Sequence, residues 1–272
     1  MTSEDAGAGR RLPLVYAPGA PGVGSPTAPS LLDRLVHALL PAPCLGCGHP
    51  LPARGAPLGL CPDCRSRLKR PPLAACAVCA FPLPAHNPPP GFRCASCREH
   101  PPGFDRLLAL WTYEPPLHEV IQGLKFGRLD YLGRHLAEAI AEILEDELSG
   151  FDAVVPVPLH WRRRLTRGYN QAERIARPLA GLLGIPLLSA LSRRRATPPQ
   201  SRLGREERLG NLRRAFRVPR PNRVRGLHLL LVDDVATTGA TLDVAAFALK
   251  NAGAATITAL AAGRTPLRHP SS

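Results

Sequence analysis

The stretch from Leu229 to Thr241, LLLVDDVATTGAT, restricts the possible folds more than any other part of the sequence. Its apolar start is typical of a strand buried on both faces of a sheet, and this strand runs directly into Asp233 and Asp234. A loop of small residues follows and leads into a helical pattern over 240–251. Strand, small-residue loop and helix in this order favour an α/β fold with a parallel sheet.

The chain beyond Pro101 repeats this alternation. Helical spacing is clear in the segment 132–147, where Leu136, Ile140 and Leu144 fall on one face. We therefore predict a mostly parallel sheet with helices on both faces. The pattern predicts strands at 107–113, 151–157, 185–189, 227–232 and 255–261, helices at 117–126, 132–147, 170–183 and 240–251, and a long polar loop at 193–215.

The loop after the 227–232 strand carries the clearest chemistry, because ligands of parallel sheets bind beyond the carboxyl ends of the strands. Small residues at a helix N-terminus offer backbone N–H groups and hydroxyls to a phosphate. The two acids before them can accept hydrogen bonds from sugar hydroxyls or hold Mg²⁺. An ordinary capped turn is the alternative, but two adjacent acids before a TTGAT loop favour a ribose 5-phosphate site. The predicted ligand residues here are Asp233, Asp234, Thr237, Thr238, Gly239, Ala240 and Thr241.

All eight cysteines of the chain form four CxxC pairs within 44–97. Two such pairs complete a four-thiolate zinc site, whereas a disulfide framework or a thioredoxin-like motif does not explain the regular repetition. We predict two structural zinc ions, since thiolates fill every coordination position. Sequential pairing of the CxxC motifs closes shorter loops than an interleaved cross-brace and is preferred. The predicted ligands are Cys44, Cys47, Cys61, Cys64, Cys76, Cys79, Cys94 and Cys97.

The net charge of +14 is concentrated in one part of the chain. Between His160 and His228 there are 18 arginines and no lysine against three glutamates, which makes this segment +15 and leaves −1 for the rest. Such a local excess of arginine favours a polyanion, either nucleic acid or a phosphorylated small molecule.

The ends of the chain give weaker signals. Residues 1–30 lack the apolar region of a signal peptide and are interpreted as the disordered leader of a cytoplasmic protein. Residues 31–40 have the spacing of a short amphipathic helix, and no run approaches the ~18 apolar residues of a membrane span. The predicted organisation is a leader (1–30), a double zinc-ribbon module (31–100), an α/β domain (101–264) and a tail (265–272).

Several further motifs accompany the 229–241 stretch: Leu124-Lys125-Phe126 with Gly133, Pro156-Val157-Pro158, Arg167-Gly168-Tyr169-Asn170-Gln171, and Gln200 with Arg208, Asn211 and Phe216. Together these motifs resemble the ComF/GntX family, whose α/β domain is of the type I phosphoribosyltransferase kind and follows a double zinc ribbon. The resemblance extends over about residues 41–264.

This resemblance implies that the two acids bind the ribose hydroxyls of phosphoribosyl pyrophosphate or a nucleotide, with Mg²⁺, and that the TTGAT loop holds the 5-phosphate. It places the turn through Pro158 like the pyrophosphate loop and the segment 193–214 like the mobile flap. It also implies a role in the uptake of single-stranded DNA during natural transformation, together with the DNA-import machinery. The expected DNA contacts are Trp161, Arg162, Arg163, Arg164, Arg167 and Tyr169.

The resemblance does not supply an acceptor base, so catalysis stays open. Two alternatives are an active phosphoribosyltransferase of nucleotide salvage and a regulator that senses phosphoribosyl pyrophosphate. The arginine-rich segment can serve DNA or a phosphorylated ligand, although a small ligand needs only a few cations.

Overall fold

The computed structural model describes residues 42–52, 56–83, 88–127, 129–159, 168–193 and 215–266. The predicted leader, the 31–40 helix, most of the predicted flap and most of the tail lie outside these ranges. Residues 41–272 belong to one compact unit. Within the described ranges, no helix has the length and apolar character needed to cross a lipid bilayer.

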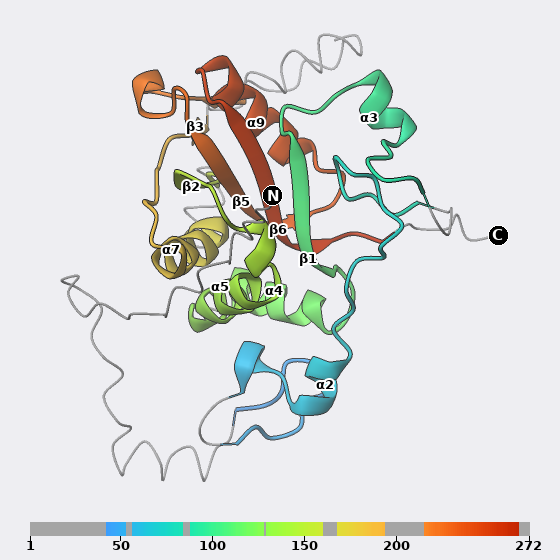
Figure 1. Cartoon of the computed structure of the whole chain (residues 1–272). Helices are drawn as coiled ribbons and strands as arrows, with labels where there is room; N and C mark the ends of the chain where they lie inside the picture. The colour runs from blue at the N-terminus through green and yellow to red at the C-terminus, as the bar shows by residue number, and fades with distance from the viewer. Residues whose placement is uncertain are drawn as a thin grey trace, which may run out of the picture. The chain divides into compact units, whose positions relative to one another are not determined.

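A four-stranded parallel sheet forms the centre of this unit (Figure 1). Its order is β1-β6-β5-β2, so within the described ranges the last strand lies between the first strand and β5. Because all neighbours are parallel, the carboxyl ends of the strands meet at one edge of the sheet. The strands are β1 (Arg106–Thr112), β2 (Ala153–Pro156), β5 (His228–Ala236) and β6 (Thr256–Arg264).

The strand residues alternate between two separate hydrophobic clusters, which shows that both faces of the sheet are covered. In β5, Leu229 and Leu231 pack in the cluster that contains α9 (Ala240–Asn251). Leu230 and Val232 pack in the other cluster, against the helices α4, α5 and α7. The predicted arrangement of a parallel sheet between two helical layers is therefore confirmed.

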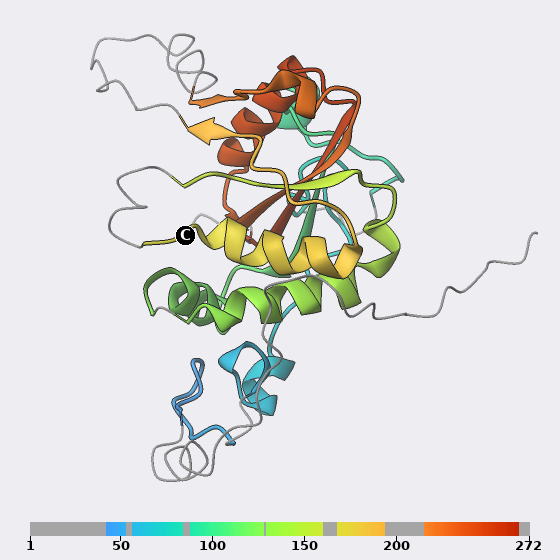
Figure 2. The same cartoon turned by 90° about the vertical axis from the view of Figure 1, so that its left-hand side faces the viewer.

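The helices α4 (Leu117–Phe126), α5 (Tyr131–Ile143) and α7 (Gln171–Leu183) cover one face, and α5 and α7 lie side by side (Figure 2). A Cβ atom at Gly133 in α5 would lie 2.5 Å from the carbonyl oxygen of Arg174 in α7, so this position requires glycine. The predicted helix 132–147 was too long: α5 ends at Ile143, and Glu145–Glu147 form a short 3-10 helix, η2. Consecutive acids near a helix C-terminus oppose the helix dipole, which explains the early end.

Two further short strands lie outside the four-stranded sheet. β3 (Ser192–Arg193) and β4 (Phe216–Arg217) form an antiparallel pair, and the 3-10 turn η3 (Pro221–Arg223) follows. The predicted strand 185–189 is only a single parallel bridge between Leu187 and Val154. Pro186 contributes its carbonyl oxygen to β2 but has no N–H to donate, which limits longer pairing.

Candidate functional site

A cavity of about 550 Å³ opens at the carboxyl edge of the sheet, between the end of β2, the start of α7 and the end of β5. Of the residues predicted from sequence, it brings together Pro158, Asp233, Asp234 and Thr241. These come from the turn after β2, the end of β5 and the N-terminus of α9, as expected for a ligand site of a parallel sheet. The lining also includes Lys125, Asn170, Gln171 and Arg193.

The acid pair is held by its own backbone and by a lysine from α4. The Nζ of Lys125 lies 2.7 Å from Oδ2 of Asp234, with both side chains mostly buried. The N–H of Asp234 donates to Oδ1 of Asp233 at 2.9 Å, and the N–H of Val235 donates to Oδ1 of Asp234 at 2.8 Å. Burial, together with the charge of Asp234, raises the pKa of Asp233 to about 8. The site thus disfavours a second negative charge on the acid pair, and a bound cation or hydroxyl donors would stabilise that charge.

The small-residue loop after β5 opens onto the N-terminus of α9. Thr237 and Thr238 are exposed, and Gly239 adopts a φ of +83° immediately before the helix. Only glycine adopts this conformation without strain, and here it turns the chain so that α9 starts at Ala240. The N–H of Ala240 bonds the hydroxyl of Thr238 at 3.3 Å. The loop therefore presents hydroxyls and a helix N-terminus beside the acid pair.

Gln171 is a site residue that our sequence reasoning did not assign a role. It begins α7, is 2% exposed and lines the cavity. Its Nε2 has no hydrogen-bond partner within the described part of the chain. The neighbouring Asn170 instead donates from Nδ2 to the carbonyl oxygen of Val157 at 3.0 Å, which ties the turn after β2 to the start of α7. The adjacent Asn170-Gln171 pair in the quoted motif was the signal that could have identified this residue.

Tyr169 is the one predicted DNA contact within the described ranges. Its hydroxyl donates to the carbonyl oxygen of Leu124, and the guanidinium of Arg174 lies 5.3 Å from its ring centroid. The hydroxyl therefore anchors the segment before α7 to the end of α4, next to Lys125. The other five predicted contacts, Trp161, Arg162, Arg163, Arg164 and Arg167, lie outside the described residues.

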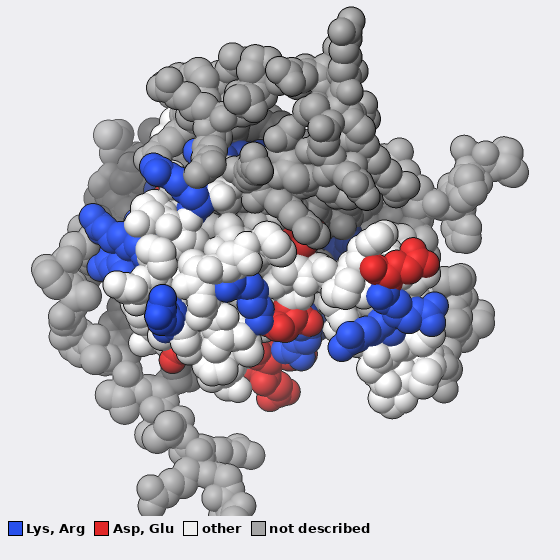
Figure 3. Space-filling model, turned by 90° about the horizontal axis from the view of Figure 1, so that it is seen from above, with Lys and Arg blue, Asp and Glu red and all other residues white. Residues whose placement is uncertain are grey.

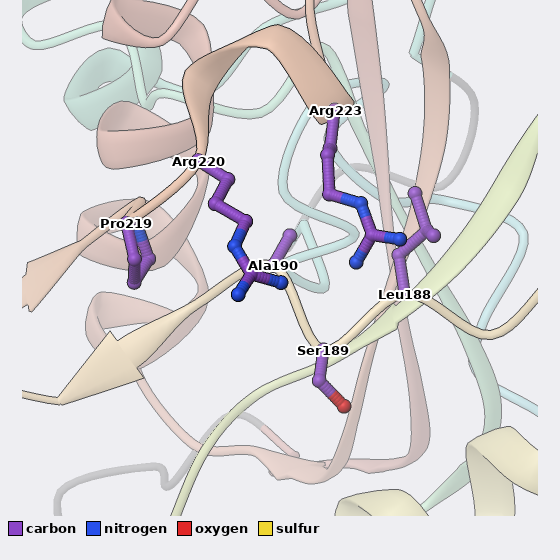
Figure 4. A pocket seen from close by; sticks show the side chains of 6 residues that line it. All are labelled: Leu188, Ser189, Ala190, Pro219, Arg220 and Arg223. Carbon is purple, nitrogen blue, oxygen red and sulfur yellow. The ribbon is translucent and has the colours of Figure 1, made fainter.

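A second cavity, of about 270 Å³, lies beside the β3–β4 pair. Leu188, Ala190 and Pro219 provide apolar lining, and Ser189 adds a hydroxyl. Arg220 and Arg223 extend from the η3 turn toward the segment that carries Ser189 (Figure 4). Both arginines are exposed, and across the described ranges neither side chain has an acidic partner.

The cysteines form two clusters with the sequential pairing predicted from the sequence. Cys44, Cys47, Cys61 and Cys64 form the first cluster, and Cys76, Cys79, Cys94 and Cys97 form the second. Within each cluster the four sulfur atoms lie within 4.8 Å of one another. The sulfurs of Cys47 and Cys61 are 3.7 Å apart, and those of Cys79 and Cys94 are 3.8 Å apart. An ion bound tetrahedrally with Zn–S bonds of about 2.3 Å separates its sulfurs by about 3.8 Å, so both clusters fit zinc.

The two clusters are built by the same backbone pattern. An antiparallel bridge flanks each first knuckle, at Pro43–Pro50 and Ala75–Pro82. The N–H of Cys61 donates to the sulfur of Cys44 at 3.2 Å, and that of Cys94 donates to the sulfur of Cys76 at 3.3 Å. Each second knuckle opens a short helix, α2 (Pro62–Ser66) or α3 (Ala95–Glu99), with its first cysteine at the N-cap and its second cysteine inside the helix. The two zinc ribbons are therefore structural repeats.

This backbone pattern also lowers the pKa of the first cysteine in each ribbon. Burial opposes ionisation of Cys44, but backbone N–H donors at Cys61, Cys47 and Gly46 outweigh it and lower the pKa of this thiol to about 6. The same balance, with donors at Cys79, Cys94 and Val78, lowers the pKa of Cys76 to about 6. A thiol that ionises readily is a better ligand, because metals bind the thiolate.

The two ribbons dock on different elements. In the first ribbon, the N–H of Leu58, in the turn η1 (Pro57–Gly59), donates to Nδ1 of His135 in α5 at 3.1 Å. In the second, the carbonyl oxygen of Val78 accepts from the N–H of Leu107 in β1 at 2.7 Å. The first ribbon thus supports the helical layer, and the second supports the edge of the sheet.

The sheet, the acid pair and the small-residue loop define a phosphoribosyltransferase-like domain, and a family comparison agrees. The family model described as "Phosphoribosyl transferase domain" matches residues 129–269, just over half of the chain. Competence protein F of Haemophilus influenzae is 31% identical over 203 residues, covering 72% of this chain and 86% of that protein. The chain belongs to the ComF family of phosphoribosyltransferase-like proteins.

Other curated relatives carry related names. Competence protein ComFC of Bacillus subtilis is 31% identical over 210 residues, covering 72% of this chain and 80% of that protein. The DNA utilization protein YhgH of Salmonella typhi is 38% identical over 175 residues, covering 62% of this chain and 76% of that protein. Among solved structures, a glutamine phosphoribosylpyrophosphate amidotransferase from B. subtilis matches 52% of this chain and 26% of its own, with 20% identity and a TM-score of 0.36.

Proposed function

We propose that the cavity at the sheet edge binds phosphoribosyl pyrophosphate, or a nucleotide, with Mg²⁺. The observation that supports this most is the convergence of an acid pair, an unpaired buried amide and an open helix N-terminus on one cavity. The acids suit ribose hydroxyls and a divalent cation, and the Thr237–Thr241 loop suits a 5-phosphate. Lys125 and Arg193 provide cations that suit a pyrophosphate group.

Gln171 provides the direct test. Replacing it by leucine removes the unpaired Nε2 while keeping a side chain of similar size in the buried position. We expect the affinity for phosphoribosyl pyrophosphate with Mg²⁺, measured by isothermal titration calorimetry, to fall by roughly ten- to a hundredfold, because one hydrogen bond to a charged oxygen contributes about 1.5–3 kcal/mol. The melting temperature should stay the same or rise, since a buried amide without a partner is a cost to the unliganded fold.

Gln122→Leu is the matched control, because Gln122 lies on α4, bonds His118 at 3.2 Å and does not line the cavity. Its affinity should equal that of the wild type. If the wild-type protein shows no binding at millimolar ligand with Mg²⁺, the phosphoribosyl assignment is wrong.

For the cellular role, we propose that this protein acts in competence by handling single-stranded DNA during its uptake. The relatives named competence protein and DNA utilization protein support this role. The described surface adds a physical basis, because the segment 215–225 contains four arginines and no acid. Seen from above, basic side chains are spread over the left half of the described surface with little acidic surface between them (Figure 3).

The cavity under Arg220 and Arg223 is the described location that best suits a nucleotide of such a strand. Its apolar lining suits the face of a base, and the two arginines suit the flanking phosphates. This arrangement does not read base edges, so the expected binding is independent of sequence.

Changing both arginines to alanine is therefore expected to weaken single-stranded DNA binding roughly tenfold at moderate salt. The slope of log affinity against log salt should fall by about 1.4, since each phosphate contact to a single strand contributes about 0.7. Fluorescence anisotropy of a labelled oligonucleotide over a salt series measures both quantities.

The charge-matched control changes Arg65 and Arg106, which are also exposed, to alanine. If this control loses as much affinity for single-stranded DNA, then binding depends only on the overall charge, and the assignment of the cavity as the DNA site is wrong. Equal affinity for an RNA oligonucleotide would make the surface a general single-strand site.

A further inference from the structure

Arg264 is a buried cation that contacts the phosphate loop, by which we mean residues 236–241. It ends β6 and is 3% exposed. Its Nη1 donates to the carbonyl oxygen of Ala236 at 2.8 Å and also to that of Thr237. Ala236 and Thr237 are the first two residues of the phosphate loop, directly after Val235, so Arg264 holds the backbone where the loop begins.

The other side of the same guanidinium contacts the second zinc ribbon. Its Nε donates to the carbonyl oxygen of Cys79 at 3.3 Å, and its Cζ lies 5.5 Å from the ring centroid of Phe81. Cys79 is a cluster residue, and the carbonyl oxygen of Phe81 accepts from the N–H of Cys76, another cluster residue. One planar side chain therefore connects the metal knuckle and the phosphate loop.

Charge strengthens this connection. A cluster of four thiolates around one divalent cation carries a net charge of about −2. Across the described residues, Arg264 has no carboxylate partner, and a buried cation is costly unless a nearby negative charge compensates it. A metal-loaded second cluster would supply that charge next to Arg264.

The first cluster offers a contrast inside the same molecule. It also has an arginine, Arg67, whose Nη2 lies 2.8 Å from the sulfur of Cys64. Arg67 is exposed, however, and it is only three residues from its cysteine in the chain. None of its hydrogen bonds within the described ranges leads to the phosphate loop.

We propose that Arg264 is a positioning residue through which the metal-loaded second cluster fixes the phosphate loop, so that ligand affinity depends on the second metal ion and not on the first. The part of this proposal that concerns ligand affinity rests on the proposed function, whereas the part that concerns loop order does not. The second ribbon is thus a component of the ligand site in addition to a folding unit.

Loop order is tested by hydrogen–deuterium exchange of peptides that cover 236–241, in full-length protein without ligand. Arg264→Gln and Cys79→Ser should each speed exchange in these peptides at least fivefold. Arg67→Gln should leave it at the wild-type rate. Cys47→Ser should lose the first metal ion only and, at a temperature well below its lowered melting point, should also exchange at the wild-type rate. Arg264→Lys keeps the charge without the planar fork and should give an intermediate rate.

Ligand affinity is measured on the same set with phosphoribosyl pyrophosphate and Mg²⁺. Arg264→Gln and Cys79→Ser should weaken binding at least fivefold, whereas the two first-cluster variants should not. Wild-type exchange in Arg264→Gln, or equal effects from Cys47→Ser and Cys79→Ser, overturns the proposal. If Arg264→Gln does not fold, Arg264→Lys provides the test. A wild-type exchange rate in the 236–241 peptides of Arg264→Lys would show that the planar guanidinium of Arg264 does not position the loop. Absence of ligand binding in the wild type rejects the proposed function, while the exchange result still decides loop positioning.

Discussion

A protein with asparagine at Asp233 should be more stable than the wild type at pH 8 and should bind the phosphoribosyl ligand far more weakly. Burial beside Asp234 raises the pKa of Asp233 to about 8, so the folded chain disfavours the ionised carboxylate. The unfolded chain ionises this group near pH 4. Wild-type stability is therefore lost progressively as the pH rises from about 4 to about 8, and asparagine removes this loss.

The same change removes a charged ligand group. With Asp234→Asn added, the affinity for phosphoribosyl pyrophosphate with Mg²⁺ should fall by at least about a hundredfold, since each charged hydrogen bond contributes about 1.5–3 kcal/mol. Melting curves of Asp233→Asn from pH 5 to pH 9 and calorimetric titrations of the double variant measure the two effects. Asp243→Asn is the control, because Asp243 accepts from the N–H of Gly103 at 2.7 Å and does not line the cavity.

This control should lose stability, because its hydrogen bond weakens, and should keep wild-type affinity. If the single variant Asp233→Asn is less stable than the wild type at pH 8, then ionisation of Asp233 does not destabilise the folded protein. Unchanged affinity in the double variant would remove the ribose assignment.

Removal of metal from the first cluster is expected to produce the largest loss of stability. Structural zinc contributes about 10–16 kcal/mol to the folding of small zinc modules. Here the first ribbon also packs into the main core, since Cys44, Leu58 and Leu60 belong to the same buried cluster as α4 and α5. Loss of this metal ion should therefore unfold more than the ribbon itself, and it should lower the melting temperature of the whole unit by more than about 10 °C.

Metal content and melting temperature are measured on the same samples, before and after treatment with a zinc chelator under reducing conditions. The purified chain should hold close to two zinc ions, and zinc should restore the melting temperature after chelation, whereas Mg²⁺ should not. Cys47→Ser should lower the melting temperature more than Cys79→Ser, because the first ribbon supports two helices. A chain that melts normally with no bound metal contradicts this account.

The local patterns were sufficient to predict most elements and the position of the acid pair. Helices α4 and α9 have the predicted bounds, since the apolar spacing ends where a glycine or a change of pattern ends the helix. The pattern does not report pairing energy, however, so a proline-containing apolar run at 185–189 was predicted as a strand and forms one bridge.

The partners of the site residues could not be predicted, because they come from distant parts of the chain. Lys125 belongs to one of the motifs behind the family resemblance, but its contact with Asp234 follows only from the packing of α4 against the sheet. Arg264 belongs to none of the sequence motifs. Its contacts exist only because the end of β6 packs against both the phosphate loop and the second ribbon. Sequence patterns predict which groups are present, whereas tertiary packing decides what they touch.

The strand order has a consequence for how the chain folds as it is synthesised. β1 pairs only with β6, the last strand of the described chain, so it leaves the ribosome long before its sheet partner exists. Until then, its backbone hydrogen bonds outside the sheet, among the described residues, run from Leu107 to Val78 of the second ribbon and from Thr112 to Lys69. A strand whose backbone groups are unpaired during synthesis is prone to aggregation. A second ribbon that has already folded around its metal ion would cover part of this strand. Zinc supply during translation should therefore control the yield of folded protein.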